Sequence, residues 1–142
     1  MWERLGPERR PYSGDRQRRL AVQEAATSLM CTLLPAIEPV QMVTIVPREK
    51  YPLGHTVVNF NEGRELNKLF TRAYLEQQLL TVLAGRAAEE LTYGPEGMSS
   101  LNQRKLILAR RIVQKLVVSN AMTDSPAIGA RLISQPDRYD WL

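Results

Sequence analysis

Residues 71–91, TRAYLEQQLLTVLAGRAAEEL, constrain the fold of this chain more than any other segment. Apolar residues recur there at four-residue steps, at Leu75, Leu79, Leu83, Ala87 and Leu91. This spacing predicts an amphipathic α-helix with one apolar face. Because such a face must pack on other elements, we expect a mainly α-helical fold.

The ends of this helix are also marked in the sequence. Thr71 is expected to cap its start, and Gly94 followed by Pro95 is expected to end it. Gly85 lies in its interior, where glycine costs about 1 kcal/mol relative to alanine. We therefore expect Gly85 to allow the close approach of another element.

Two further helices are predicted on either side of this segment. One spans about residues 16–34, with Asp15 as its cap and Pro35 as its stop. The other spans about residues 99–120, where Ser100 and Gln103 have the spacing of a capping box. The apolar positions of the first of these helices are Leu20, Ala21, Ala25, Leu29 and Leu33.

Short strands separate the first predicted helix from the second. Residues 42–46 and 55–60 are rich in β-branched and apolar residues and are bounded by turn residues, which predicts a small β-sheet. Residues 61–66 are polar, and Gly63 is expected to act as a breaker there. One more short strand is predicted near residues 130–133.

Composition limits the class of protein. A chain of 142 residues with 44% hydrophobic residues can form one domain with a core, and no apolar run reaches the roughly 18 residues of a membrane span.

Residues 1–20 hold six arginines against three acidic residues and so carry most of the net charge of +4. Aromatic residues are not interleaved with them, so no nucleic-acid partner is expected. The Pro- and Gly-containing residues 1–14 are interpreted as a basic linker, and residues 15–142 as one domain.

Several segments, taken in order, resemble the protease domain of the FtsH-type ATP-dependent zinc metalloproteases. The segment LAGRAAEELTYGPEG is similar to the family's L-x-G-R-A-A-E-E-L-x-x-G pattern, and LLPAIEPVQMVTIVPR to its P-V-x-x-V-T-I-x-P-R segment. The other matching segments are GPERRPYSG, YPLGHTVVNF and ARRIVQKLVVSNAMTD. The resemblance implies a helical domain with a small β-sheet or hairpin. It also implies a further helical segment beyond the last residue, so the chain is interpreted as either a fragment or a shortened version.

The resemblance also identifies positions for a zinc site. Active relatives carry H-E-A-G-H on the first helix, and a later helix supplies an aspartate as the third ligand. Here Gln23 and Thr27 stand at the two histidine positions, Leu101 stands at the aspartate position, and Glu24 is retained at the general-base position. A neutral amide and a hydroxyl are weak zinc ligands, and leucine has no donor atom.

The residue counts lead to the same conclusion. The chain contains one histidine, His55, and one cysteine, Cys31, so it cannot supply a His-His-carboxylate site. His55 is interpreted as a strand or surface residue, with a substitute metal ligand as the alternative. Cys31 is interpreted as a small core residue. We therefore predict a non-catalytic domain that has no functional catalytic residue and binds neither zinc nor ATP, since no phosphate-binding G-x-x-x-x-G-K-[ST] motif occurs.

The resemblance implies partners as well. Family members assemble as membrane-bound rings, so homologous FtsH-like subunits and polypeptide substrates are expected, with the ATPase and membrane segments upstream. Inactive members suggest a chloroplast envelope or thylakoid setting. One strand is expected either to receive an extended peptide or to be structural; it comprises Met42, Val43, Thr44, Ile45 and Val46. The alternatives are an active metallopeptidase completed by partner subunits and a stand-alone peptide-binding module.

Overall fold

A computed structural model describes residues 6–59, 61–67 and 69–124, and for residue 65 it describes the backbone alone. Four α-helices, two short 3-10 turns, one π-helical turn and one two-stranded antiparallel sheet form in this part, so the predicted mainly α fold with a small sheet is confirmed. The elements in chain order are α1 (Gly14–Leu33), β1 (Val40–Thr44), β2 (His55–Val58), α2 (Glu62–Asn67), α3 (Arg72–Tyr93) and α4 (Gln103–Gln114).

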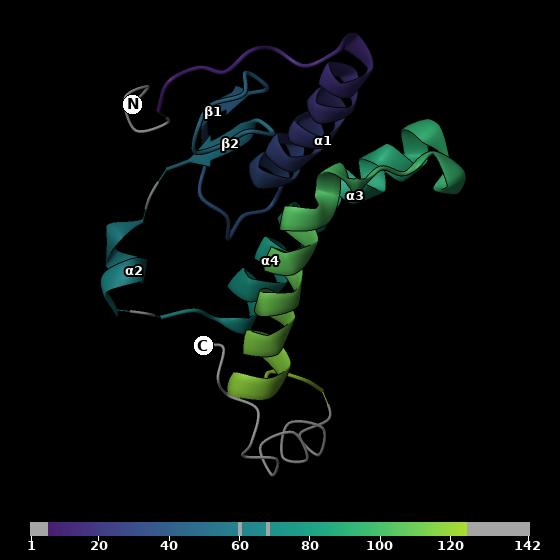
Figure 1. Cartoon of the computed structure of the whole chain (residues 1–142). Helices are drawn as coiled ribbons and strands as arrows, with labels where there is room; N and C mark the ends of the chain where they lie inside the picture. Colours follow the sequence, from purple (N-terminus) through teal and green to yellow (C-terminus); the bar gives the residue numbers. More distant parts are fainter. Residues whose placement is uncertain (1–5, 60, 68, 125–142) are drawn as a thin grey trace, which may run out of the picture.

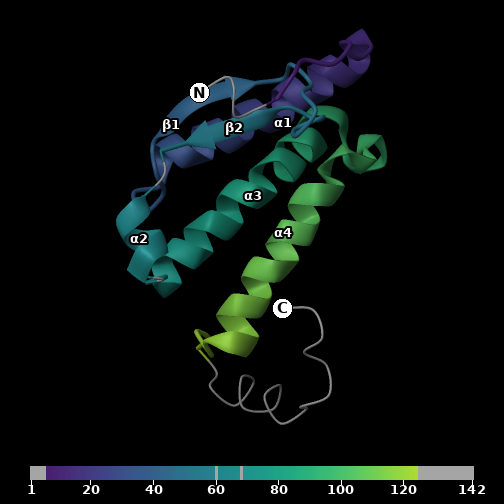
Figure 2. The same cartoon turned by 60° about the vertical axis from the view of Figure 1, so that its left-hand side comes forward.

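The elements form layers around α1 and α3. The β1–β2 hairpin lies against α1, and α1 packs along α3, which in turn packs against α4 (Figures 1 and 2). α2 connects the hairpin to the start of α3 (Figure 1). No helix in the described ranges combines the length and the hydropathy needed to cross a bilayer.

The two predicted strands form, with shifted bounds. In the antiparallel register, Thr44 pairs with His55 and Val43 pairs with Thr56. β1 ends two residues earlier than predicted, because the backbone N–H of Val46 donates to the Thr44 hydroxyl at 3.1 Å instead of extending the ladder. Pro47 follows and has no N–H to offer a strand.

The loop between the strands closes over the end of β1. Gly54 in this loop has a φ of +82°, and a Cβ there would lie 2.7 Å from the carbonyl oxygen of Thr44. Only glycine fits this position without a shift of the backbone.

The polar segment after β2 forms a helix, and our expectation of a loop around Gly63 was wrong. The Asn61 side-chain oxygen accepts a hydrogen bond from the backbone N–H of Arg64 at 2.9 Å. This contact satisfies a free donor in the first turn of α2, so the glycine is tolerated near the helix start.

The start and the buried face of α1 both differ from the prediction. Ser13 holds the cap position without a side-chain hydrogen bond, and Asp15 lies inside the first turn, where it accepts from Arg19 at 3.2 Å. Leu29 and Leu33 are 58% and 65% exposed. The buried residues of α1 include polar ones, because this face packs on a polar part of α3; they are Leu20, Gln23, Glu24 and Cys31.

α3 confirms the predicted cap and the role of its glycine. The Thr71 hydroxyl accepts from the backbone N–H of Tyr74 at 3.2 Å. A Cβ at Gly85 would lie 3.2 Å from the Cβ of Gln23, so this glycine lets α1 and α3 approach closely. The apolar stripe is buried at Leu75 but 89% exposed at Leu91, because the packed face of α3 turns polar along its length.

The predicted capping box before α4 is wrong, since the chain makes a 3-10 turn there first. The turn spans Ser100–Asn102, and the Ser99 hydroxyl accepts from the backbone N–H of Leu101 at its start. α4 then continues into one π-helical turn, Lys115–Ser119. The apolar core lies between α3 and this end of α4 and contains Tyr74, Leu75, Ile112 and Leu116.

Residues before α1 contact the loop after β1. The backbone N–H of Arg9 donates to the Pro47 carbonyl at 2.8 Å, and Arg48 forms an ion pair with Glu8 at 2.7 Å. The division into a linker over residues 1–14 and a domain over residues 15–142 stays a prediction. The strand predicted near residues 130–133 lies outside the described residues.

Candidate functional site

The three degenerate motif residues of α1 lie on its buried side. Gln23 and Thr27 are four residues apart and therefore share one helix face. Gln23 and Glu24 are only 2% and 4% exposed. The helix therefore presents two side chains on one face, as a helix with two metal ligands does. The side chains are the amide of Gln23 and the hydroxyl of Thr27, at positions where the resemblance implies imidazoles.

Gln23 is held by a buried carboxylate on α3. Its Nε2 donates to Oε2 of Glu89 at 3.1 Å, and Glu89 is fully buried. A metal-binding histidine commonly donates its second N–H to a carboxylate in this manner. The Gln23 amide therefore makes the kind of contact to a carboxylate that such a histidine makes.

Glu89 accepts three further hydrogen bonds. Ser99 Oγ donates at 2.6 Å, Asn102 Nδ2 at 2.7 Å and an Arg19 guanidinium nitrogen at 3.1 Å. Burial by itself raises the pKa of Glu89, but the hydrogen bonds from Ser99, Arg19 and Gln23 outweigh burial and bring the pKa below its ordinary value. Glu89 is therefore an ionised carboxylate whose contacts are all made within the protein.

The retained Glu24 has a different partner, a lysine from α4. Lys105 Nζ lies 2.7 Å from Glu24 Oε1 and 2.9 Å from Thr27 Oγ1. The other carboxylate oxygen of Glu24 accepts from the Thr56 hydroxyl at 2.7 Å. The Thr27 hydroxyl donates to the backbone carbonyl of Gln23 at 2.9 Å. An ammonium group thus bridges the general-base position and the second histidine position.

Lys105 follows Leu101 by four residues, which is about one helical turn. Both residues border the same cavity as Glu24 and Thr27. Leu101, which the resemblance assigns to the third ligand, therefore borders the same cavity as the motif residues of α1, and Lys105 comes from the following turn.

The cavity has a volume of about 380 Å³ and is bounded by α1, by the loop before β2 and by α4. His55 borders it and stacks on Tyr51, with ring centroids 4.0 Å apart. Burial is the main cause that lowers the pKa of His55, the charge of Glu24 raises it, and Lys105 and Lys50 lower it further. His55 is therefore close to the motif in space, although it is distant in sequence.

The proposed peptide-binding strand lies elsewhere. None of residues 42–46 borders the cavity, whereas its neighbour β2 does so through His55 and Thr56. Thr44 is buried, while Val43 and Val46 are about two-fifths exposed. Peptide binding by this strand stays a prediction.

Cys31 lies one turn beyond Thr27 and is buried, as predicted for a small core residue. Burial raises the pKa of its thiol. A protonated, buried thiol is a poor nucleophile and a poor metal ligand.

Comparison with known proteins identifies the family. The profile described as peptidase family M41 matches residues 10–139. The chain is 36% identical over 138 residues to ATP-dependent zinc metalloprotease FtsH 2 of Symbiobacterium thermophilum, covering 96% of this chain and 22% of that protein. It is 33% identical over 121 residues to FtsH 3 of Synechocystis sp., covering 84% and 20%.

A plant relative is also similar. The chloroplastic ATP-dependent zinc metalloprotease FTSH 1 of Oryza sativa subsp. japonica is 32% identical over 114 residues, covering 79% of this chain and 16% of that protein. The chain belongs to peptidase family M41 and has its FtsH-type protease domain. It spans about a fifth of the length of the curated relatives it matches.

These relatives are named as zinc enzymes, and the residues at the ligand positions here do not fit that metal. Gln23 already donates to Glu89, Thr27 already contacts an ammonium group, and Leu101 has no donor atom. Across residues 6–59, 61–67 and 69–124, no three His, Cys, Asp or Glu side chains are grouped so that they could hold a metal ion. That the chain takes up no zinc stays a prediction.

Sequence reasoning missed the partners of both buried carboxylates. Lys105 could have been found from its spacing, because it follows the lost ligand position Leu101 by one turn. Glu89 lies four residues after Gly85 and so shares the face of α3 that the glycine opens to α1. No local signal, however, connects Lys105 with Glu24, which is 81 residues away.

Proposed function

We propose that this chain is a non-catalytic FtsH-like protease domain, a pseudoprotease. It acts as a scaffold or substrate-handling subunit of a membrane-bound ring of the AAA protease type, in protein quality control or translocation. The observation that carries the proposal is the Lys105 ammonium, which lies 2.7 Å from Glu24 and 2.9 Å from Thr27.

The ammonium provides the positive charge that the buried Glu24 needs, but it cannot do the chemical work of zinc. A bound metal ion makes water a strong nucleophile near neutral pH by lowering its pKa. A lysine ammonium group can donate hydrogen bonds, but unlike a metal ion it cannot coordinate a water molecule. A metal ion entering this site would have to displace Lys105 from its carboxylate and would still lack imidazole ligands.

An active hydrolase without metal is the weaker alternative. Thr27 and Lys105 form a hydroxyl–amine pair, and such pairs require a neutral amine as the base. Here the Lys105 nitrogen forms an ion pair with Glu24, and the Thr27 hydroxyl already donates to the Gln23 carbonyl. The same contacts disfavour an enzyme completed by zinc ligands from partner subunits, because Lys105 already contacts Glu24 and Thr27.

The surroundings of the protein are proposed from its relatives. Homologous FtsH-like subunits are the proposed ring partners, and ATP binding and membrane anchoring are assigned to parts of the assembly other than this domain. The similarity to plant relatives named as chloroplastic supports a chloroplast setting. A stand-alone peptide-binding module is the remaining alternative, and the presence of an ATPase module in the whole protein decides between the two.

Zinc stoichiometry tests the proposal. The folded chain is incubated with excess zinc, free metal is removed by gel filtration, and bound metal is measured per chain. We expect almost none. The matched control combines Gln23→His, Thr27→His, Leu101→Asp and Lys105→Ala, and should take up about one zinc per chain, as expected for two imidazoles and a carboxylate. The same set of substitutions with Lys105 retained should bind zinc more weakly.

One outcome would overturn the pseudoprotease proposal. If the unaltered chain retains about one zinc per chain, as a three-ligand site would, and loses it on replacement of Glu24 or His55, a remodelled metal site exists. The chain would then be an enzyme candidate, and peptide hydrolysis would be the next assay.

A further inference from the structure

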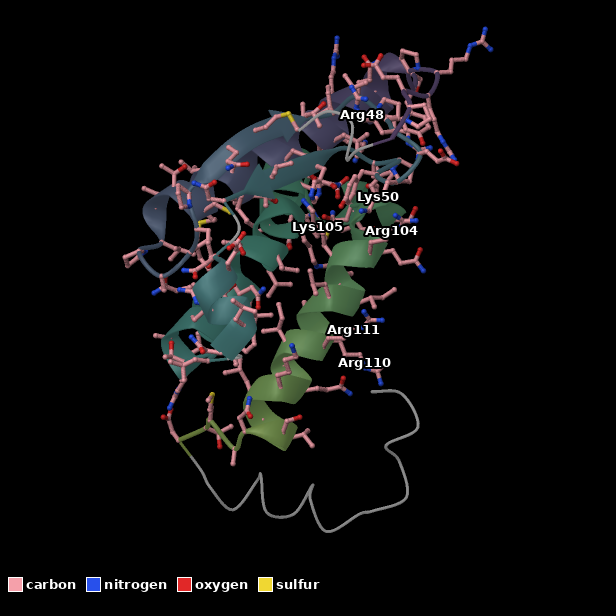
Figure 3. All side chains as sticks on the ribbon, turned by 90° about the vertical axis from the view of Figure 1, so that its left-hand side faces the viewer. Arg48, Lys50, Arg104, Lys105, Arg110 and Arg111 are labelled. Atoms are coloured by element: carbon pink, nitrogen blue, oxygen red, sulfur yellow. The ribbon has the colours of Figure 1, made fainter. Side chains whose placement is uncertain are left out.

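The cavity at the degenerate motif carries an excess of positive charge. Lys50, Arg104 and Lys105 border it, and Glu24 is the only carboxylate among the described residues that do so. Figure 3 shows the three cationic residues close together near the start of α4, whereas Arg110 and Arg111 lie further along that helix. The charge of the described residues around this cavity therefore suits an anion.

Two of these cations have few contacts within the protein. Arg104 is exposed and forms no hydrogen bond or ion pair within the part of the chain that the structure describes. The Lys50 ammonium is exposed and lies 5.7 Å from the centroid of the Tyr51 ring. Lys105 uses two of its three N–H donors, on Glu24 and Thr27, and its side chain is 25% exposed. Donors thus remain available at the cavity.

The rest of the wall suits a polypeptide. Every residue from Lys50 to Thr56 borders the cavity, so backbone as well as side chains is exposed to a ligand. Pro52, Leu53 and Leu108 add apolar surface. A volume of about 380 Å³ lies in the range of binding pockets.

We infer that this cavity binds a carboxylate of a polypeptide, with Lys50 and Arg104 contacting the acidic group and Lys105 holding the floor of the site. The inference rests on the proposed function, because it assigns to the substrate-handling domain a preference for acidic segments. A polynucleotide is disfavoured, since Tyr51 and His55 stack on each other and offer no continuous platform for bases.

Fluorescence anisotropy with short labelled peptides tests the inference on the 142-residue chain. One peptide has glutamates between apolar residues, a second has glutamines in their place, and both have amidated C-termini. A third is the glutamine peptide with a free C-terminal carboxylate. We expect a carboxylate to tighten binding about tenfold, as a charge-assisted hydrogen bond does, and high salt to weaken it.

Charge-removing variants connect the binding to this cavity. Lys50→Gln and Arg104→Gln should each weaken binding of the preferred peptide about threefold to tenfold. Arg111→Gln is the matched control on the same helix, and Arg86→Gln is the control on α3; neither residue borders the cavity. All four side chains are exposed, so the variants should fold, which thermal unfolding verifies.

The possible outcomes are distinct. Preference for the glutamate peptide identifies an internal acidic segment, and preference for the free carboxylate identifies a chain end; both support the inference. Equal affinity for all peptides, equal weakening by the control variants, or tighter binding of a single-stranded oligonucleotide would overturn it. Zinc uptake is measured separately, so failure of the peptide assay leaves the pseudoprotease proposal intact, and zinc uptake defeats that proposal alone.

Discussion

Two buried carboxylates in this domain, Glu89 on α3 and Glu24 on α1, are stabilised in contrasting ways. Glu89 accepts hydrogen bonds from four residues of the protein and is fully buried. Glu24 is 4% exposed, accepts from Lys105 and Thr56 within the part of the chain that the structure describes, and borders a cavity.

The difference separates a carboxylate enclosed by the protein from one that borders a cavity. Donors from α1 and from the turn before α4 fix Glu89, so this carboxylate of α3 joins the three parts. A single lysine, Lys105, balances the charge of Glu24, and both residues of this ion pair border the cavity. In this FtsH-type domain, a lysine side chain therefore supplies the positive charge next to Glu24.

The largest expected loss of stability follows from replacing Glu89. Glu89→Gln removes the charge and places an amide N–H₂ among four donors, so we expect the free energy of unfolding to fall by about 3 kcal/mol. Chemical denaturation measures it. Glu90→Gln, on the exposed face of the same helix, is the matched control and should change stability by less than about 0.5 kcal/mol.

Acid titration sharpens this first prediction. Because the pKa of Glu89 is lowered in the folded protein, its stabilising contribution is present above the unfolded-state pKa and is lost as pH falls through the folded-state pKa. Glu89→Gln should lack this part of the acid dependence. An unchanged acid profile in the variant would mean that Glu89 is not the charged centre of the network.

The second largest expected loss of stability follows from breaking the ion pair between Glu24 and Lys105. Lys105→Met leaves a buried carboxylate without its cation and should cost about 2 kcal/mol, less than a fully buried pair because Lys105 is partly exposed. Adding Glu24→Gln should restore most of that loss, and denaturation of the two single variants and the double variant measures the coupling. Strictly additive losses would show that the pair does not interact.

The third effect concerns the close contact that supports Glu89. Gly85→Ala places a methyl group 3.2 Å from both the Cβ and the carbonyl oxygen of Gln23. Overpacking outweighs the gain in helix propensity, so we expect a net loss of about 1 kcal/mol. Gly14→Ala, at a position where a Cβ meets nothing within 4 Å, should not destabilise.

The smallest expected effect is the contribution of His55, which borders the cavity, to the pH dependence of stability. Burial lowers the pKa of His55, so the folded state disfavours its protonated form. Its contribution is fully present above the unfolded-state value of 6.5 and declines as pH falls below it. Denaturation between about pH 7 and about pH 5 should show a slight decline that His55→Asn removes. Identical pH dependence in the two proteins would contradict this assignment.

The helix segments and the degenerate positions were accessible from the sequence because they depend on local spacing. The four-residue apolar steps and the Thr71 cap predicted α3, and the positions of Gln23, Thr27 and Leu101 predicted a site poor in metal ligands. Errors arose where a partner distant in sequence decides the outcome. Leu91 fits the apolar stripe but is exposed, since the buried face of α3 passes through Thr81, Gly85 and Glu89 instead.

The sequence by itself determined the family, the helices and the loss of the imidazole and carboxylate ligands, since one histidine in 142 residues leaves no alternative set. Only the tertiary structure decided what replaced them. Lys105 reaches Glu24 across 81 residues, and Glu89 reaches Gln23 across 66. Such contacts depend on how α1, α3 and α4 pack together, because helical periodicity determines which face a residue shares but not what lies opposite that face.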